Sequence, residues 1–134
     1  MSRASNALEN FNLNHIFNKE ALPTVTNMFL GLFLDDPGET MALTSEVQNG
    51  SNYARVTLSV LMSAASVGAI ANATEVAFNV ASNTWGTIKW LGVYDTHILA
   101  TGRGYLRTSM TSPLYIDTGK QMKLAASNLV FTCD

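Results

Sequence analysis

The stretch around which the hydrophobic pattern is organised is residues 84–95, which contain both tryptophans of the chain. Successive side chains of an extended strand point to opposite faces. The alternation therefore predicts Ile88, Trp90 and Tyr94 on one face and Leu91 and Val93 on the other. A strand that is apolar on both faces is typically central in its sheet or covered on its second face. Nothing in this stretch is typical of a catalytic device, which indicates packing and assembly.

The N-terminal region has a helical period instead. Residues 5–19 are predicted to form one amphipathic helix, with Ala4, Leu8, Phe11 and His15 on one stripe and Ala7 and Ile16 beside it. Pro23 ends this region. We therefore expect an N-terminal helix or arm over residues 1–22 and a single β-domain over residues 23–134. Such a helix either covers an open end of the sheet or reaches into a neighbouring subunit.

Residues 53–62 alternate clearly between apolar and polar positions. The pattern predicts that Ala54, Val56, Leu58, Val60 and Met62 face inward and that Arg55, Thr57 and Ser59 face outward. Tyr53 and Arg55 would share a strand face, where they are candidates to anchor a partner by stacking or ion pairing. An ordinary solvated sheet face explains these two residues equally well.

The remaining segments after Thr24 read as short strands separated by turns. Residues 97–106 are predicted as one strand, and residues 108–117, which contain Pro113, as an edge strand or arm. Asp35 and Asp36, followed by Pro-Gly, indicate a turn. Together the segments give about seven or eight short strands after one helix. This predicts a mainly β fold, an antiparallel β-sandwich or barrel preceded by one N-terminal α-helix.

Composition adds an apolar surplus to this pattern. Hydrophobic residues make up 47% and charged residues only 13% of the 134 residues, and the formal net charge is −2. A small soluble monomer usually carries more surface charge, so the surplus favours a surface buried against other subunits over a large core alone. No basic run offers a nucleic-acid footprint. No apolar run is long enough to span a bilayer, so we expect no membrane partner.

The polar residues give no catalytic or metal-binding constellation. Two histidines, His15 and His97, are too few and too scattered for a zinc site. Asp95 and His97 would share a strand face, but no nucleophile context accompanies them. The first twenty residues lack the apolar core of a signal peptide, and the single cysteine, Cys133, fits a protein made in a reducing cytosol. We therefore expect no catalytic residue, no metal and no cofactor.

Several stretches together resemble a family of small tailed-bacteriophage virion structural proteins, often labelled tail-fibre or minor structural proteins. The residues that carry the resemblance are Met28-Phe-Leu-Gly-Leu-Phe-Leu-Asp-Asp-Pro-Gly38, Ser45-Glu-Val-Gln-Asn-Gly-Ser-Asn-Tyr-Ala-Arg-Val56, Val76-Ala-Phe78, Trp85-Gly-Thr-Ile-Lys-Trp-Leu-Gly-Val-Tyr-Asp95, Ile98 to Gly104, Thr118-Gly-Lys120 and Leu129 to Asp134. They follow one another in the family's order and cover nearly the whole chain. The Tyr-Ala-Arg and Trp-Gly-Thr stretches are the strongest of these motifs.

The resemblance implies a non-enzymatic building block of the virion, made in the host bacterial cytoplasm. Two locations remain open: an accessory capsid subunit, that is a cement or decoration protein bound to the major capsid protein shell, and a tail-fibre or baseplate component. The family label favours the fibre, whereas the single domain without a repetitive shaft favours decoration, which we take as the first expectation. A small ligand-binding or hydrolase-like β-protein is the remote alternative.

On this interpretation the chain self-associates as a dimer or trimer and binds other virion proteins. The candidate interface residues lie on the predicted helix, on the strand at residues 53–62 and on the arm at residues 108–117. They are Leu8, Phe11, Ile16, Tyr53, Arg55, Leu114, Tyr115 and Ile116. The helix and the arm would make the subunit contacts, and the β-domain would supply rigidity.

Overall fold

The computed structural model describes residues 2–48 and 50–132, and Cys133 therefore lies outside the described residues. Within them the chain forms one helix and nine strands. In order these are β1 (Ser2–Ala4), α1 (Asn6–Phe17), β2 (Phe29–Phe33), β3 (Val56–Thr57), β4 (Ala69–Ala71), β5 (Val76–Val80), β6 (Gly86–Tyr94), β7 (Gly104–Ile116), β8 (Gln121–Leu124) and β9 (Val130–Thr132). The prediction of a mainly β fold with one N-terminal helix is confirmed.

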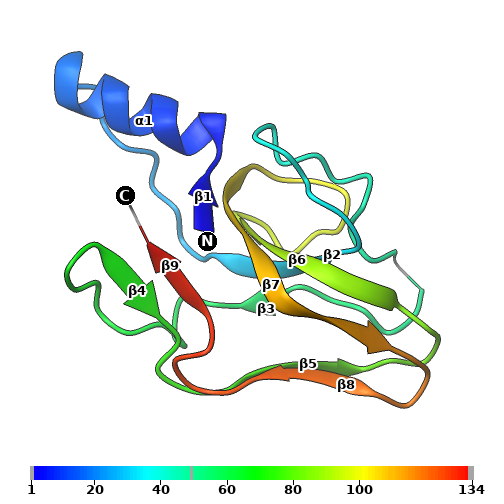
Figure 1. Cartoon of the computed structure of the whole chain (residues 1–134). Coiled ribbons are helices and arrows are strands. Elements are labelled where there is room, and N and C mark those ends of the chain that lie inside the picture. Colours follow the sequence, from blue (N-terminus) through cyan, green and yellow to red (C-terminus); the bar gives the residue numbers. More distant parts are fainter. Residues whose placement is uncertain (1, 49, 133–134) are drawn as a thin grey trace.

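The strands form one five-stranded sheet and two two-stranded ribbons, all antiparallel. The order in the large sheet is β1-β7-β6-β2-β3, so β6 is its central strand, as the sequence predicts. The β5–β8 ribbon crosses below this sheet and the β4–β9 ribbon lies beside it, with helix α1 above (Figure 1). This arrangement leaves one face of the large sheet against the ribbons and the other against the loops that follow β2.

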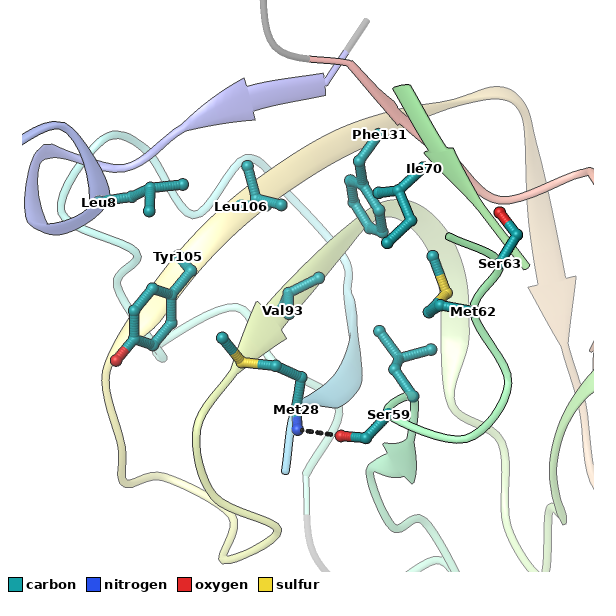
Figure 2. A pocket seen from close by; sticks show the side chains of 11 residues that line it. Leu8, Met28, Ser59, Met62, Ser63, Ile70, Val93, Tyr105, Leu106 and Phe131 are labelled. Atoms are coloured by element: carbon teal, nitrogen blue, oxygen red, sulfur yellow. Dashed lines mark hydrogen bonds between the residues drawn. The ribbon is translucent and has the colours of Figure 1, made fainter. Parts of the chain in front are cut away.

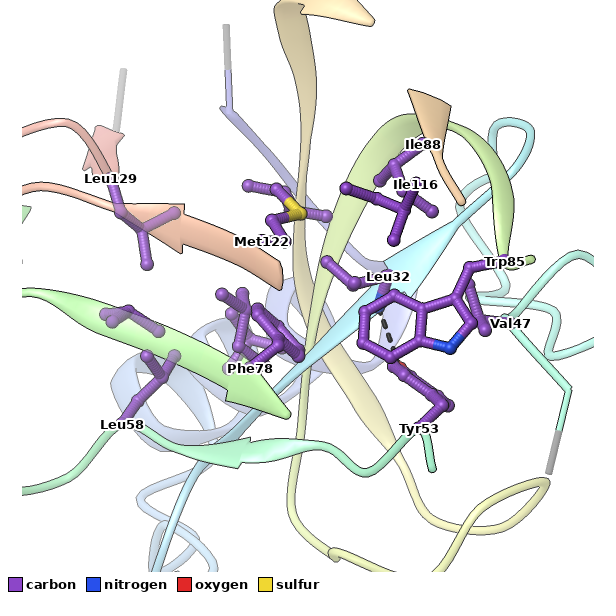
Figure 3. Close-up of a cluster of buried hydrophobic side chains, with 14 of the residues drawn as sticks. Leu32, Val47, Tyr53, Leu58, Phe78, Trp85, Ile88, Ile116, Met122 and Leu129 are labelled. Carbon is purple, nitrogen blue, oxygen red and sulfur yellow. Dashed lines mark hydrogen bonds between the residues drawn. The ribbon is translucent and has the colours of Figure 1, made fainter. Parts of the chain in front are cut away.

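The main hydrophobic core lies between the large sheet and the β5–β8 ribbon (Figure 3). Leu32 of β2, Ile88 of β6 and Ile116 of β7 meet Phe78 of β5 and Met122 of β8 there, and each of these side chains is at most 1% exposed. Full burial of a side chain of this size contributes about 1.5–3 kcal/mol to folding. A smaller second cluster covers the other face of the sheet and contains Phe33, Met41 and Tyr94.

Strand β6 is apolar on both faces, as predicted, but one side chain lies on the opposite face from the one expected. Ile88 packs in the main core with Leu91 and Val93, whereas Trp90 and Tyr94 belong to the second cluster. The pairing of β6 with β7 shifts register between Ile88 and Trp90. A β-bulge of this kind inserts extra residues and re-aims the side chains on either side of it, which a simple alternation rule does not include.

The prediction for residues 53–62 is wrong in its length and in several of its faces, although Leu58 is buried and Ser59 exposed as expected. Only Val56–Thr57 forms a strand. Arg55, expected outside, is 5% exposed, whereas Val60, expected inside, is 83% exposed. The regular period ends because residues 58–61 turn, with the Leu61 amide donating to the Leu58 carbonyl. Arg55 is inside because a buried carboxylate, described below, pairs with it.

The helix begins one residue later than expected and is preceded by a strand that the sequence pattern did not show. Ser5 is the N-cap: its hydroxyl accepts a hydrogen bond from the Leu8 amide and donates one to the Gly104 carbonyl, 2.7 Å away. The three residues of β1 extend the large sheet beyond β7. The predicted division into an arm over residues 1–22 and a β-domain over residues 23–134 remains a prediction. Strand β1 lies within the predicted arm but belongs to the large sheet of the β-domain.

Strand β7 is partly an edge strand, in agreement with the prediction from Pro113. Strand β1 pairs with it only at Leu106, Arg107 and Thr108, so its second half has a strand partner on one side only among the described residues. The segment predicted as a strand at residues 97–106 is instead a loop up to Arg103, and β7 begins at Gly104.

Candidate functional site

The best-defined polar site is a buried ion pair between Glu46 and Arg55. The Nε and Nη2 atoms of Arg55 donate to the two carboxylate oxygens of Glu46, each at 2.7 Å. Tyr53 donates its hydroxyl to Glu46 at 3.0 Å and accepts a hydrogen bond from the Leu32 amide at 2.9 Å. Because every one of these groups is buried, the bidentate geometry and the extra hydrogen bonds are what make the pair tolerable in the interior.

Arg55 also ties a distant loop to this pair. Its Nη1 atom donates to the carbonyls of Thr96 and Thr101, at 2.9 and 3.0 Å. Its guanidinium lies 4.2 Å from the ring centroid of Tyr94, in cation–π geometry. One side chain therefore fixes the loop that precedes β3, strand β6 and the loop between β6 and β7.

A cross-strand pair of glycines makes room beside the ion pair. Gly31 of β2 lies opposite Gly92 of β6. A Cβ atom at Gly31 would lie 3.0 Å from a Glu46 carboxylate oxygen, and one at Gly92 would lie 2.9 Å from the Phe33 ring. Both glycines are therefore needed for close approach rather than for an unusual backbone angle.

The Trp85 side chain packs against the same loop. Its indole nitrogen donates to the Ser51 carbonyl at 2.9 Å, and its ring meets the edge of Tyr53 at a centroid distance of 5.5 Å. The two strongest motifs of the sequence, Tyr-Ala-Arg and Trp-Gly-Thr, are thus joined around one buried network. Their arrangement stabilises the fold, and Tyr53 and Arg55 are not available on the surface as partner anchors.

Two buried tyrosines of this network predict sensitivity to alkali. Burial, reinforced by the charge of Glu46, raises the pKa of Tyr53 and of Tyr94 well above the usual value. In the unfolded chain both side chains have the ordinary tyrosine pKa of about 10. The stability contributed by their neutral forms is therefore fully present below that pH and is lost as the pH rises toward the raised pKa values.

We expect the free energy of unfolding to be unaffected by these two tyrosines below about pH 10 and to fall progressively as the pH rises above that value, by about 1.4 kcal/mol per pH unit for each group. Denaturant titrations at each pH, with phenolate absorbance recorded in parallel, measure this. Replacing Tyr94 with Phe should reduce the pH dependence, because one of the groups with a raised pKa is removed and only a hydrogen bond to the Met41 carbonyl is lost. Tyr105, whose pKa burial also raises, should retain its share of the pH dependence. Ionisation of all four tyrosines without loss of structure would contradict the assignment.

A second buried arginine lies on β7. Arg107 is 3% exposed, and its Nε atom lies 3.3 Å from a carboxylate oxygen of Asp36, which follows β2. Among the described residues its Nε and Nη1 atoms make no hydrogen bond of good geometry. The ion pair links the turn at residues 35–38 to the sheet, and this turn forms as predicted, with the Gly38 amide donating to Asp36.

The residues considered for a catalytic relay serve the loop between β6 and β7. Asp95 accepts hydrogen bonds from the Arg103 amide and the Tyr105 hydroxyl, at 2.8 and 3.4 Å. The His97 ring packs on Phe29 with a centroid distance of 5.7 Å. Within the described residues Asp95 and His97 share no hydrogen bond, and no cluster of three metal-ligating side chains is present.

An apolar cavity of about 370 Å³ lies under helix α1, between the large sheet and the β4–β9 ribbon (Figure 2). Leu8 points into it from the helix, Leu106 from β7 and Phe131 from β9. The hydroxyls at its rim are already used: Ser59 accepts from the Met28 amide, and Ser63 donates to the Ala64 carbonyl. The lining offers apolar contact and no acid, base or nucleophile pair.

The inner face of helix α1 holds the helix to its own domain. The Phe11 ring lies 6.1 Å from Tyr105 and 4.9 Å from the Arg103 guanidinium. Leu8 and Phe11 are half-buried, but no residue of the helix is fully buried. These two predicted interface residues therefore contact the chain itself.

The C-terminal half of helix α1 and the chain just after it carry several exposed large apolar side chains. Ile16 and Phe17 are 65% and 74% exposed, and Leu13 and Leu22 are also exposed. We call these four residues the helix-end patch. Leu13 and Phe17 were not recognised from the sequence because they fall off the predicted stripe; their signal was an apolar residue on the polar side of a helix.

The predicted arm at residues 108–117 likewise contains both exposed and buried candidate interface residues. Leu114 and Tyr115 are exposed on β7, whereas Ile116 is 1% exposed and lies in the main core. Ile16, Leu114 and Tyr115 thus remain predicted subunit contacts, while Tyr53, Arg55 and Ile116 are interior residues. The carboxylate that explains Arg55 is that of Glu46, which was not assigned a role from the sequence. Its signal was that it is the only acidic residue between positions 40 and 55.

The chain was compared with models of known protein families. The model of a family described as "Gp80: Podophage GP4 fiber I protein gp80" matches residues 3–132. A search of curated proteins finds no match. None of the described helices is both long and apolar enough to span a lipid bilayer.

Proposed function

The chain belongs to the family of podophage GP4 fiber I protein gp80, and from this membership we propose that it is a non-enzymatic structural subunit of a podophage tail fibre. The observation that carries the proposal is the extent of the family match, which runs from β1 through β9. The family makes the chain a phage structural protein. Its placement in a fibre, within the virion, follows the family's printed description.

The chemistry of the interior supports a structural role. The two strongest motifs of the sequence form the buried network around Glu46, which fastens loops to the sheet and presents no group to a ligand. The apolar cavity is likewise without paired acid, base or nucleophile. These features favour a rigid assembly unit over an enzyme.

The surface supports self-association as the way this unit is used. The helix-end patch and the exposed Leu114 and Tyr115 of β7 place large apolar side chains in water. Contiguous exposed apolar surface on a small protein typically marks a protein–protein contact. A fibre of repeated subunits needs contacts of this kind, each of modest strength and used many times. We expect a dimer or trimer and contacts with neighbouring virion proteins.

A second location is favoured by one observation. The described chain packs its strands around one main core, and its single helix spans 12 residues, so it contains no shaft of its own. A compact subunit without a shaft also suits an accessory capsid protein bound to the major capsid protein shell. The fibre location ranks first because the family description names a fibre.

Gold-labelled antibodies against the purified chain test the location on intact virions by electron microscopy. We expect gold on the tail fibres, and virions from a phage with the gene disrupted provide the control. Gold distributed over the head would move the chain to the capsid. Virions that carry no label, although the protein is detected in the infected cell, would overturn its role as a virion subunit.

A further inference from the structure

The outer edge of β7 is open over most of its length. Strand β1 covers it at Leu106, Arg107 and Thr108 only. On the other side, the pairing of β7 with β6 runs from Thr108 and Ser109 directly to Leu114, so residues 110–113 have no partner in that ladder. Open strand edges bind other strands readily, and proteins usually protect them with charges. Residues 109–116 contain no charged side chain, and Pro113 is their only edge-breaking residue.

A groove of about 470 Å³ runs along this edge. One wall is β7 from Thr108 to Ser112, the other is the chain from Asn128 to Val130, and no lining residue is charged. Hydroxyl and amide side chains lie beside apolar ones such as Leu124. This mixture, next to unpaired backbone, suits an extended uncharged segment that pairs through its main chain.

Strand β1 already shows how a segment sits between these walls. It pairs with β7 on one side, while the Ser2 hydroxyl on the other side donates to the Thr132 carbonyl at 3.0 Å and accepts from the Thr132 amide at 2.7 Å. The groove begins at Thr108, the residue opposite Ser2 at the end of this pairing. An added strand would continue the line of β1 along the same edge.

The chain itself carries a segment of matching chemistry. Residues 21–27 connect α1 to β2 without helix or strand, lie mostly exposed, and contain no charged residue. Within the described residues, no hydrogen bond is made by their backbone amides. Thr24, Val25 and Thr26 are residues that favour the extended conformation. The segment spans seven positions, and the β7 wall of the groove spans five.

We propose that residues 21–27 of one copy add as a strand in the β7 groove of a second copy. The contact joins two different surfaces, so each copy can donate a segment and accept one. Contacts of this heterologous type generate rings when the rotation closes and filaments when it does not. The inference rests on the self-association that the proposed function includes, and it names one contact that would contribute to it.

Cysteine cross-linking between two variants tests the contact. In a Cys133→Ser background, Thr24→Cys is mixed with Ser112→Cys under mild oxidation; both positions are exposed, so the fold is not at risk. A disulfide requires Cα atoms within about 7 Å. We expect a disulfide-linked dimer in this mixture, and loss of that dimer when Ser112→Cys is replaced by Thr118→Cys, an exposed turn position outside the groove.

Each other outcome overturns the contact. A linked dimer from Ser112→Cys alone would show that two β7 edges meet each other. An oligomer, seen by sedimentation, that gives no linked dimer would reject this groove while leaving the structural role of the chain intact. Protein that neither self-associates nor labels the virion would overturn both the contact and the proposed function.

Discussion

Replacing Glu46 with alanine is expected to lower the free energy of unfolding by about 3–5 kcal/mol. The substitution leaves the guanidinium of Arg55 buried without its counter-charge and removes the acceptor of the Tyr53 hydroxyl. Removing one partner of a buried pair is costly because the remaining charge stays desolvated. Denaturant unfolding followed by tryptophan fluorescence measures the effect, since Trp85 packs on Tyr53.

The exposed ion pair between Glu75 and Lys123 supplies a matched control. Its atoms lie 3.3 Å apart, and both side chains are about half exposed. Replacing Glu75 with alanine should cost less than about 1 kcal/mol, because solvent screens the pair. The double variant Glu46→Leu with Arg55→Met should recover part of the loss, since no unpaired charge remains. Equal costs for Glu46→Ala and Glu75→Ala would contradict a buried network that stabilises the fold.

The second large effect is expected on assembly rather than on folding. Replacing Ile16 and Phe17 together with aspartate should weaken self-association by about 30-fold or more, which corresponds to loss of a contact worth about 2 kcal/mol. Both side chains are largely exposed in the single chain, so the fold has little to lose. Sedimentation equilibrium measures the dissociation constant, and circular dichroism verifies the fold.

Val60 provides the matched control for this pair. It is 83% exposed but lies outside the helix-end patch. Val60→Asp should leave self-association unchanged. If it weakens assembly as much as the helix-end variant does, general surface hydrophobicity drives association and the patch has no special role. Unchanged association of the Ile16 and Phe17 variant would remove the patch from the interface.

The sequence determined the features that depend on local chemistry. The central position of the Trp90 strand followed from its two apolar faces, and the turn at residues 35–38 followed from Asp, Pro and Gly chemistry. Helix α1 followed from its period, because a helical stripe needs only the positions of Leu8 and Phe11 relative to each other. Each of these elements is decided by residues close together in the chain.

The tertiary structure decided the features that depend on distant partners. Arg55 reads as an outward residue until Glu46 is known to reach it in the interior, and Ile88 reads as belonging with Trp90 until the bulge against β7 is seen. The three-residue strand β1 has no pattern of its own and forms because the edge of β7 accepts it.

The same reason separates the two kinds of surface residue. Hydropathy showed that the chain has more apolar side chains than a small core needs, but it did not show which of them remain in water. Ile116 is buried and its neighbour Tyr115 is exposed because the sheet places them on opposite faces. Composition fixes the amount of apolar surface, whereas long-range packing decides where that surface lies and thus where another chain can bind.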